Sequence, residues 1–511
     1  MNSRTLICVT TMTLLAALAM PVQLAAQHIR YKLIDIPTLG GPAAYGNVDC
    51  PECAQFINNP GVVVGGADSS IHDPNAPNCG NADCFLTHAF RWQDGVLTDL
   101  GTLPGVNFSH ATSINARGWA TGGSGTAEID PQTGNPQEHA VLWKGIEIVD
   151  LGTLRAGLDS AGLTVNNAGE VVGMATVDTT LDSFPVGPWR SPTHAFIWRN
   201  GVMQDLGTLG GADSFPTGGC NNERSDLAVG FSFTDSTANA STGLPTQHAF
   251  VWDHGTMTDI PTLGGTFAFA QCTNNQAQVI GQSSFLGDVG CDPSDPLNTC
   301  DEHAFSWNHG TLTDLKPLGG SFSVALWLNN DGEAVGGSFT TGDNEFHATL
   351  WKHGGISDLD ADDCFSIATA INSKHQIIGN TFNCNTNIFR TVLWDNGSII
   401  DLNAAIAPNS SLFLLEPDNI NERGEIVGRG APPGCDNLDL CGHVFLLIPC
   451  ASGQGCEGSD QSGTGIGSPA ISMGATTPSQ RRRVTKEFVT QLRTRLAQRY
   501  HIRGLGASSR N

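Results

Sequence analysis

The chain has few basic residues, has no long apolar run beyond its first segment, and lacks the common catalytic signatures. Lys and Arg number 25 against 49 Asp and Glu, a formal net charge of −24. Such a charge repels nucleic acid, so we expect no nucleic-acid partner. After residue 20, no stretch is apolar for long enough to span a bilayer. Gly-x-Ser-x-Gly, His-Glu-x-x-His and a phosphate loop are absent, which leaves no signature of those enzyme classes.

Residues 1–26 have the pattern of a secretory signal peptide. Arg4 precedes the largely apolar run Leu6–Met20, and Leu24-Ala25-Ala26 offers a small-residue cleavage site before Gln27. The apolar run is too short to cross a membrane comfortably. We therefore expect an exported protein that is secreted, periplasmic or held at the cell surface.

What the chain does have is a repeated phrase: His-Ala-Phe-x-Trp, a Gly, an apolar-x-Asp-Leu ending and often Gly-Thr-Leu-Gly-Gly. It begins at His88, His194, His248 and His303, with weaker copies at His139 and His347 and a seventh through Trp394. The motif tryptophans are 43 to 55 residues apart, a period typical of propeller blades. Apolar residues alternate within the phrase, which indicates β-strands.

Each repeat is expected to contribute four strands. A turn starting at Asn and an apolar-apolar-Gly strand precede each histidine, as in VNNAGEVVG at Asn166. Ala277 and His375 replace the turn glycine in two copies, where we expect a looser or locally different turn. The Asp ending and the strand before it each occur eight times, but out of phase. We therefore predict an all-β, eight-bladed β-propeller over residues 28–450, closed by pairing Tyr31–Ile36 with His443–Pro449.

This phrase resembles the HAF-repeat family of bacterial extracellular proteins over residues 31–449. Arg390-Thr391-Val392 replaces His-Ala-Phe in one copy, and Asp360-Ala361-Asp362-Asp363 replaces Gly-Thr-Leu-Gly-Gly in another. The resemblance implies an exported repeat protein of β-propeller type. It implies no activity, so no catalytic residue is carried over.

Fourteen of the fifteen cysteines lie outside the predicted signal. An even number in an exported chain favours disulfides over metal. The Cys50-Pro51-Glu52-Cys53 spacing also suits zinc, but no second pair follows at a suitable distance. The other pairs that we predict are Cys79–Cys84, Cys220–Cys272, Cys291–Cys300, Cys364–Cys384, Cys435–Cys441 and Cys450–Cys456.

The repeated histidines and aspartates are predicted to be structural. A residue present in every blade is placed by the architecture, and equivalent atoms of neighbouring blades are too far apart to share one metal ion. We expect each histidine to satisfy a backbone or Asp group between strands. The aspartates are expected to be buried acceptors at strand ends. Trp327 lies on a predicted inner strand, as blade core or as a carbohydrate platform.

Function is expected where the repetition fails. The connection between the second and third strands of a blade is predicted to be long at 67–87, 124–138, 174–193, 231–247 and 282–302. It is short at 338–346 and 380–389. An uneven rim of loops on a rigid scaffold suits binding of a glycan or protein. We therefore favour a non-enzymatic binding or scaffolding protein, as a monomeric ring. Neutral insertion on a tolerant surface is the alternative.

Acidic spots within the non-repeating segments offer two further hypotheses. Carboxylates gather at Asp292 and Asp295 and at Asp360, Asp362 and Asp363, and clustered oxygens suit Ca²⁺. Paired carboxylates at the mouth of the channel would instead suit a glycoside hydrolase or lyase. These are the candidate calcium ligands and the alternative function, a carbohydrate-active enzyme.

The end of the chain differs in composition from the repeats. Residues 451–480 are rich in Gly, Ser, Thr and Pro, which is typical of a flexible linker. Residues 451–511 carry nine basic and three acidic residues and Arg4 adds one more charge, so the repeat region carries −31. Residues 481–511 form a basic tail, in which roughly Thr485–Tyr500 is predicted to be an amphipathic helix and Arg481–Tyr500 to be the contacting segment. It would contact an anionic surface, either lipid headgroups or the protein's own acidic ring. A solubilising, disordered tail is the alternative.

Overall fold

The computed structural model describes residues 30–46, 55–74, 76, 79, 83–155, 157–185, 187–217, 223–291, 300–360, 363–450, 491 and 494–495. Within these residues the architecture is all-β, as predicted, with thirty-two strands and two one-turn helices, α2 (Leu402–Ala405) and α3 (Leu438–Cys441). The predicted signal peptide and linker lie outside the described residues.

The strands form four-stranded antiparallel units. Separate sheets are formed by β2 (Gly40–Tyr45), β3 (Val63–His72), β4 (Phe85–Gln93) and β5 (Val96–Asp99); by β6 (Gly105–Ile114), β7 (Trp119–Ile129), β8 (Pro136–Lys144) and β9 (Glu147–Asp150); by β10 (Ser160–Val165), β11 (Val171–Thr176), β12 (Thr193–Arg199) and β13 (Val202–Asp205); and by β30 (Phe413–Ile420), β31 (Ile426–Ala431), β32 (His443–Pro449) and β1 (Tyr31–Ile36).

Two larger sheets each combine two such units, joined by one parallel pair of residues. The first contains β14 (Ser214–Thr217), β15 (Leu227–Phe233), β16 (Gln247–Asp253), β17 (Thr256–Ile260), β18 (Gly264–Thr273), β19 (Gln278–Phe285), β20 (Glu302–Asn308) and β21 (Thr311–Asp314). The second contains β22 (Gly319–Leu328), β23 (Ala334–Thr340), β24 (Phe346–Lys352), β25 (Gly355–Asp358), β26 (Phe365–Ile371), β27 (Ile377–Asn383), β28 (Ile388–Asp395) and β29 (Ser398–Asp401).

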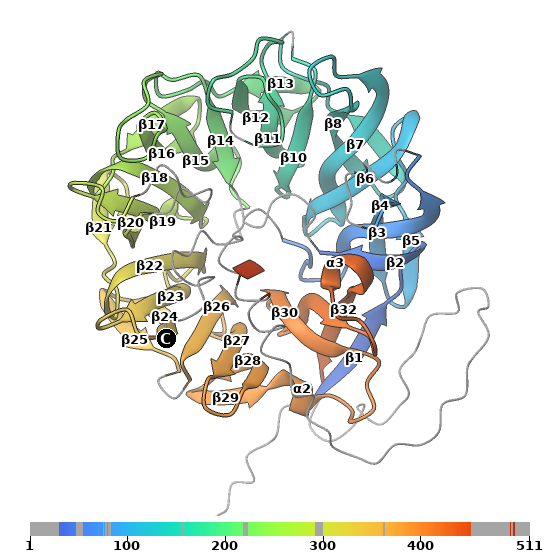
Figure 1. The fold of residues 1–511 in the computed structure, drawn as a ribbon. Helices are drawn as coiled ribbons and strands as arrows, with labels where there is room; N and C mark the ends of the chain where they lie inside the picture. The colour runs from blue at the N-terminus through green and yellow to red at the C-terminus, as the bar shows by residue number, and fades with distance from the viewer. Residues whose placement is uncertain are drawn as a thin grey trace, which may run out of the picture.

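The sheets are arranged radially around a common centre, with first strands such as β10, β22 and β30 innermost (Figure 1). This is the arrangement of a β-propeller. The predicted pairing of the two ends is present: β1 runs antiparallel to β32, from Tyr31 opposite Pro449 to Ile36 opposite Val444. The first described strand therefore completes the last sheet.

The glycine of the apolar-apolar-Gly strand faces the phenylalanine of the His-Ala-Phe strand. Gly281 of β19 pairs with Phe305 of β20, whose side chain is fully buried. A Cβ on Gly281 would lie 2.1 Å from the carbonyl oxygen of Phe269 and 2.7 Å from the Phe305 ring. The repeat keeps glycine here because both the inner strand and the aromatic ring occupy the space of a side chain.

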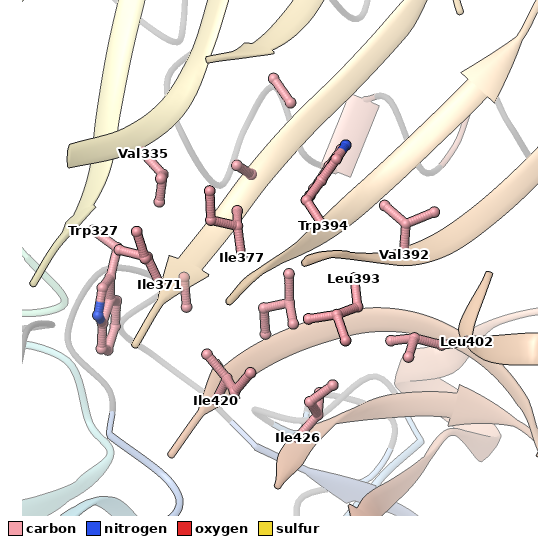
Figure 2. Packing of buried hydrophobic residues seen from close by; sticks show 14 of the residues in the cluster. Trp327, Val335, Ile371, Ile377, Val392, Leu393, Trp394, Leu402, Ile420 and Ile426 are labelled. Atoms are coloured by element: carbon pink, nitrogen blue, oxygen red, sulfur yellow. The ribbon is translucent and has the colours of Figure 1, made fainter. Parts of the chain in front are cut away.

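Trp327 belongs to a buried hydrophobic cluster. Its side chain is 6% exposed, and the cluster includes Ile371, Ile377 and Trp394 (Figure 2). The cluster combines residues of several neighbouring units, so it forms the core between blades. The prediction of a core position for Trp327 is confirmed, and the carbohydrate platform is excluded by its burial.

The expectation of looser turns at Ala277 and His375 is wrong. Both residues adopt the left-handed conformation that the turn glycines use, with φ of 58° and 61°. The turn is held by its asparagine, since Asn274 Oδ1 accepts from the Gln278 N–H at 3.1 Å and Asn372 Oδ1 from the Gln376 N–H at 3.1 Å. These hydrogen bonds impose the turn even where a side chain makes positive φ less favourable.

Candidate functional site

Each motif histidine bonds to a motif aspartate, so the repeated chemistry is structural. The histidine Nδ1 lies 2.7–3.0 Å from the carboxylate that ends the neighbouring fourth strand. The pairs are His88–Asp99, His139–Asp150, His194–Asp205, His248–Asp259, His303–Asp314, His347–Asp358 and His443–Asp35. The last pair joins the two ends of the described repeat region.

The predicted burial of these aspartates is wrong. Their side chains in the seven pairs are 16–49% exposed, because each lies where its strand ends at the surface. Burial acts to raise the pKa of Asp99, but its hydrogen bonds from His88 and from the Gly101 N–H lower that pKa below its usual range. The same balance lowers the pKa of Asp314, where Lys316 adds to the effect of His303. Asp99 and Asp314 are therefore held ionised by their partners.

The arginine that replaces histidine in one copy contacts a predicted calcium ligand of the preceding copy. Asp360 and Asp363 are buried, and Arg390 Nη2 donates to Asp363 Oδ2 at 2.5 Å. Burial and the neighbouring Asp363 raise the pKa of Asp360 to about 6. Burial opposes ionisation of Asp363 as well, but Arg390 lowers its pKa. A guanidinium therefore already neutralises Asp363.

The other predicted calcium ligands, Asp292, Asp295 and Asp362, lie outside the described residues. Among the residues that the structure does describe, no group of three His, Cys, Asp or Glu side chains has the arrangement of a metal site. Calcium binding stays a prediction of the sequence.

Asparagine side chains link successive blades on one face of the ring. The Asn58 Nδ2 donates to the Asn115 carbonyl at 2.9 Å, and Asn115 in turn donates to the Asn166 carbonyl at 2.8 Å. The same link runs from Asn274 through Asn329 and Asn372 to Asn421, and Asn421 donates back to the Asn58 carbonyl at 3.0 Å. We call this series of residues the asparagine belt. It joins blades through the turns between first and second strands.

The opposite face carries the connections between second and third strands, and we call it the loop-rich face. In the structure, the second and third strands of the eight units are connected by residues 73–84, 130–135, 177–192, 234–246, 286–301, 341–345, 384–387 and 432–442. The short pair at 341–345 and 384–387 is confirmed. The long loop predicted at 124–138 is wrong, because β7 and β8 extend into it and leave six residues. The sequence analysis missed 432–442, which contains α3.

Disulfides stabilise three of these connections. Cys79–Cys84, Cys291–Cys300 and Cys435–Cys441 each lie within one connection, and Cys364–Cys384 ties another to the start of β26. All four pairs were predicted. Cys272 and Cys450 are also disulfide-bonded. Their predicted partners Cys220 and Cys456 lie outside the described residues, as do Cys50 and Cys53.

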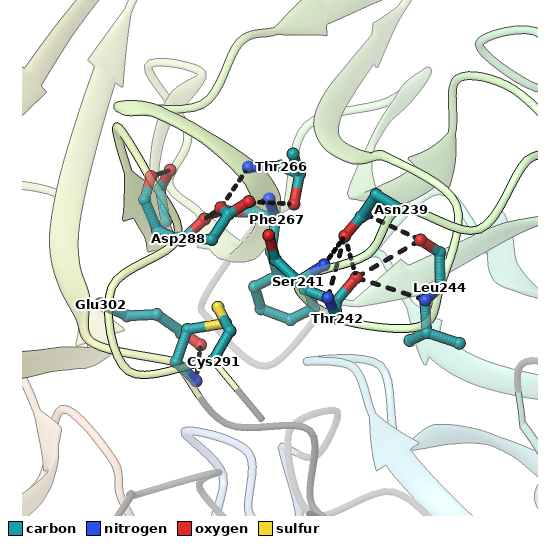
Figure 3. The surroundings of a disulfide bond; sticks show 12 residues. Asn239, Ser241, Thr242, Leu244, Thr266, Phe267, Asp288, Cys291 and Glu302 are labelled. Atoms are coloured by element: carbon teal, nitrogen blue, oxygen red, sulfur yellow. Dashed lines mark hydrogen bonds between the residues drawn. A yellow bond between two sulfur atoms is a disulfide. The ribbon is translucent and has the colours of Figure 1, made fainter. Parts of the chain in front are cut away.

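Hydrogen bonds order the backbone around the Cys291–Cys300 disulfide. Asp288 accepts from the Thr266 N–H at 2.7 Å and from the Thr266 hydroxyl at 2.9 Å (Figure 3). Beside the disulfide, Glu302 is 1% exposed. Burial raises the pKa of Glu302 to about 8. This carboxyl is therefore protonated near neutral pH, which removes the cost of burying a charge.

Two further buried carboxyls, those of Asp68 and Asp213, have raised pKa values. Burial raises the pKa of Asp68 to about 8, and its hydrogen bond with Asp83 adds to the effect. Burial likewise raises the pKa of Asp213 to about 8, with a contribution from Asp182. Each is one carboxyl of a hydrogen-bonded pair, and a single shared proton satisfies such a pair.

The richest cluster of charges lies between β30, β31 and α3. Glu416 is 3% exposed, and Arg429 donates to its Oε2 from Nε at 3.0 Å and from Nη2 at 2.7 Å. Arg429 Nη1 also donates to Asp439 Oδ1 at 3.3 Å. Burial acts to lower the pKa of Arg429, but the surrounding carboxylates raise it, Glu416 most of all. Two carboxylates thus share one buried guanidinium.

A second guanidinium comes from the C-terminal tail. Arg495 Nη1 donates to Glu416 Oε1 at 3.2 Å, and its Nη2 donates to Asp439 Oδ2 at 2.7 Å. Asn437 adds an oxygen 3.5 Å from Nη2. Glu416 and Asp439 therefore each lie between Arg429 and Arg495. We call Glu416, Asn437 and Asp439, with Arg429 behind them, the guanidinium site.

Tyr45 connects this site to the first blade. Its hydroxyl donates to the Asp439 carbonyl at 3.1 Å and lies 3.1 Å from Asp83 Oδ2. Burial raises the pKa of Tyr45, and the charges of Asp68 and Asp83 raise it further. Tyr45 is thus a neutral hydrogen-bonding partner that holds α3 against the loop of the first blade.

Sequence reasoning did not single out the guanidinium site. One signal was available in the sequence. Glu416 precedes the asparagine of its turn by five residues, and the equivalent positions in the two preceding blades are Ile367 and Val324. A carboxylate in that apolar position breaks the repeat. Arg429 and Asp439 carry no comparable signal, because their neighbourhood arises only from the fold.

Comparison with known proteins adds little about activity. No family model and no curated protein matches the chain. Among solved structures, it is similar to the β-propeller domain of the trilobed protease from Pyrococcus furiosus, with 9% identity, a TM-score of 0.40 and coverage of 66% of this chain and 93% of that one. A polysaccharide lyase of family PL25, an ulvan lyase, aligns with 10% identity, a TM-score of 0.38 and coverage of 80% and 95%.

A third similar structure is a puromycin-hydrolysing peptidase of Mycobacterium tuberculosis, with 12% identity and a TM-score of 0.38. The alignment covers 78% of this chain but only 62% of the peptidase. At these scores we draw no functional conclusion. In the part of the chain that the structure describes, no helix is long and apolar enough to span a membrane.

Proposed function

We propose that the protein is an eight-bladed β-propeller of the HAF-repeat family, closed by the pairing of β1 with β32. Support for eight blades comes from the eight antiparallel four-stranded units. Support for closure comes from the β1–β32 ladder, the His443–Asp35 bond and the return of the asparagine belt from Asn421 to Asn58. The predicted signal and the disulfides favour export to an oxidising compartment.

We further propose that it is a non-enzymatic binding or scaffolding protein that uses the loop-rich face. One observation carries this proposal: the repeated polar groups are engaged in bonds between strands and blades, whereas the unique groups lie on that face. Its connections and the strand ends beside them also expose aliphatic side chains, namely Ile71, Ile129, Leu181, Leu286, Val289 and Leu440. Exposed apolar residues on disulfide-stabilised loops suit recognition of a glycan or protein.

The test is a binding screen of the full chain on glycan and protein arrays, with and without EDTA. A hit is then compared for Leu181→Ser and Leu286→Ser, which lie on the loop-rich face, and for Ile146→Ser, which lies on the opposite face and is 80% exposed. We expect the first two to weaken binding several-fold and the control to leave it unchanged. Equal effects on both faces would contradict the proposal.

The alternative function is a carbohydrate-active enzyme. The hydrogen-bonded carboxyl pairs Asp68–Asp83 and Asp182–Asp213 favour it, because a proton donor with a raised pKa is the acid that glycoside cleavage needs. Their burial counts against it, since neither Asp68 nor Asp213 is open to a sugar. Turnover of any glycan in the same screen, lost in Asp213→Asn, would establish the enzyme and remove the binding proposal.

A further inference from the structure

The guanidinium site brings two carboxylates against one guanidinium of the ring and a second one from the tail. Glu416 and Asp439 carry two negative charges, and Arg429 supplies one positive charge. Arg429 is 8% exposed and Glu416 3% exposed, so water screens this imbalance only weakly. Arg495 adds a second positive charge through two carboxylate contacts, at 3.2 Å and 2.7 Å. The planar guanidinium, with several N–H donors, can bond both carboxylates at once.

The site lies between an innermost strand and the loop-rich face. Glu416 is on β30, an innermost strand, and Asp439 is on α3 of the loop-rich face. The described part of the tail, drawn in red, lies near the centre of the ring (Figure 1). Gln491, Thr494 and Arg495, the described residues of the tail, have helical backbone conformation, and the predicted amphipathic helix otherwise lies outside the described residues. The predicted contact of the tail with the protein's own acidic ring therefore has a defined partner.

The linker is long enough for this contact. Cys450 follows β32, a third strand, so the linker starts on the face opposite the loop-rich face. About 40 residues separate Cys450 from Gln491, and a chain of that length can span at most roughly 140 Å. Such a reach is compatible with crossing from one face of the ring to the other.

We infer that Arg495 of the basic tail binds the guanidinium site as a built-in competitor for ligands of that site. The external ligand that fits this site is a basic helical peptide that presents an arginine. A tethered segment acts at an effective concentration of about a millimolar, so only a ligand that outcompetes this concentration displaces the tail. The inference rests on the proposed function in one respect, that the loop-rich face is the binding face.

The test uses the full chain and a fluorescently labelled synthetic peptide of residues 488–502. Arg495→Ala removes the internal competitor, so we expect this variant to bind the peptide at least about tenfold more tightly than the wild type, by fluorescence anisotropy. Arg503→Ala makes the same charge change eight residues further on and should bind as the wild type does. A peptide carrying the Arg495→Ala change should bind to neither protein.

A second substitution locates the site. Asp439→Asn combined with Arg495→Ala should abolish the gain in affinity for the peptide. The fold should tolerate Asp439→Asn because the side chain of Asp439 is 44% exposed. Equal peptide binding by wild type and Arg495→Ala, or an unchanged gain in the double variant, would overturn the inference. Hydrogen exchange of 437–442 provides a check without peptide: we expect Arg495→Ala to lower its protection.

The two proposals fail differently. If Arg495→Ala binds the peptide as expected but no array ligand depends on the loop-rich face, the tail contact stands and the binding function fails. If array ligands bind wild type and Arg495→Ala equally well through Leu181 and Leu286, the binding function stands and the competing role of the tail fails.

Discussion

Asn421 Nδ2 donates a 3.0 Å hydrogen bond to the carbonyl oxygen of Asn58, which lies 363 residues away in the sequence. Both groups are buried, so neither has water as a substitute partner. The same kind of bond joins successive blades in the asparagine belt. Here it joins residues from the two ends of the described repeat region. The two ends of the described repeat region are thus joined twice, by the β1–β32 ladder towards the outside and by this bond nearer the centre.

We expect Asn421→Ala to lower the free energy of unfolding by about 1–3 kcal/mol, because it leaves the Asn58 carbonyl buried without this donor. Urea denaturation measures the change. Asn344→Ala is the matched control, since Asn344 is exposed and its side chain bonds only within its own loop. An equal effect of both substitutions would argue against a stabilising role for the belt.

Gly281→Ala should destabilise the protein by about 1–3 kcal/mol, because the added methyl collides with the Phe269 carbonyl and the Phe305 ring. Gly355→Ala serves as the control. Its Cβ would meet only the Lys352 carbonyl, at 3.4 Å, and the residue is exposed. Thermal denaturation of the two variants compares them directly, and the strand assignment fails if both melt alike.

The stability of the protein should decrease as pH rises from about 4 to 8. The pKa of Asp213 is raised to about 8 in the folded protein, whereas an unfolded aspartate titrates near 4. Between these values only the folded state holds the proton, so each rise of one pH unit costs up to about 1.4 kcal/mol for this group. Asp213→Asn should flatten that part of the curve, as measured by urea denaturation at several pH values. An unchanged slope would show that Asp213 is ionised in the native state.

Acid should destabilise the protein through the histidine–aspartate pairs. The pKa of Asp314 is lowered in the folded protein, so its stabilising effect is present above pH 4 and is lost as pH falls below the unfolded value. Asp314→Asn should therefore reduce the loss of stability between pH 4 and pH 2 while lowering stability at pH 5. Asp343→Asn, at an exposed loop, controls for a general change of charge.

The repeat made most of the architecture predictable. Periodic phrases such as HAFIWRNG at His194 contain their strands, hairpin turn and buried Phe196 within about ten residues, so local physics specifies them. The eight shifted copies also predicted the pairing of the chain ends. Errors arose where context overrides local preference, as at His375, where the asparagine of the turn imposes a left-handed backbone.

The candidate site could not be predicted in the same way. Glu416, Arg429, Asp439 and Arg495 are spread over 80 positions of the chain and share no motif. Reading a repeat identifies what every blade has in common, and this site is built from what one blade alone contains.

By itself the sequence determined the strands, the turns, the histidine–aspartate pairs and four of the disulfides, because each arises from residues close in the chain or from a copy of the same phrase. Only the tertiary structure decided which carboxylates are buried, which share a proton and which guanidinium groups lie between Glu416 and Asp439. Those properties depend on solvent exclusion and on distances between remote segments, and neither quantity exists until the ring is assembled.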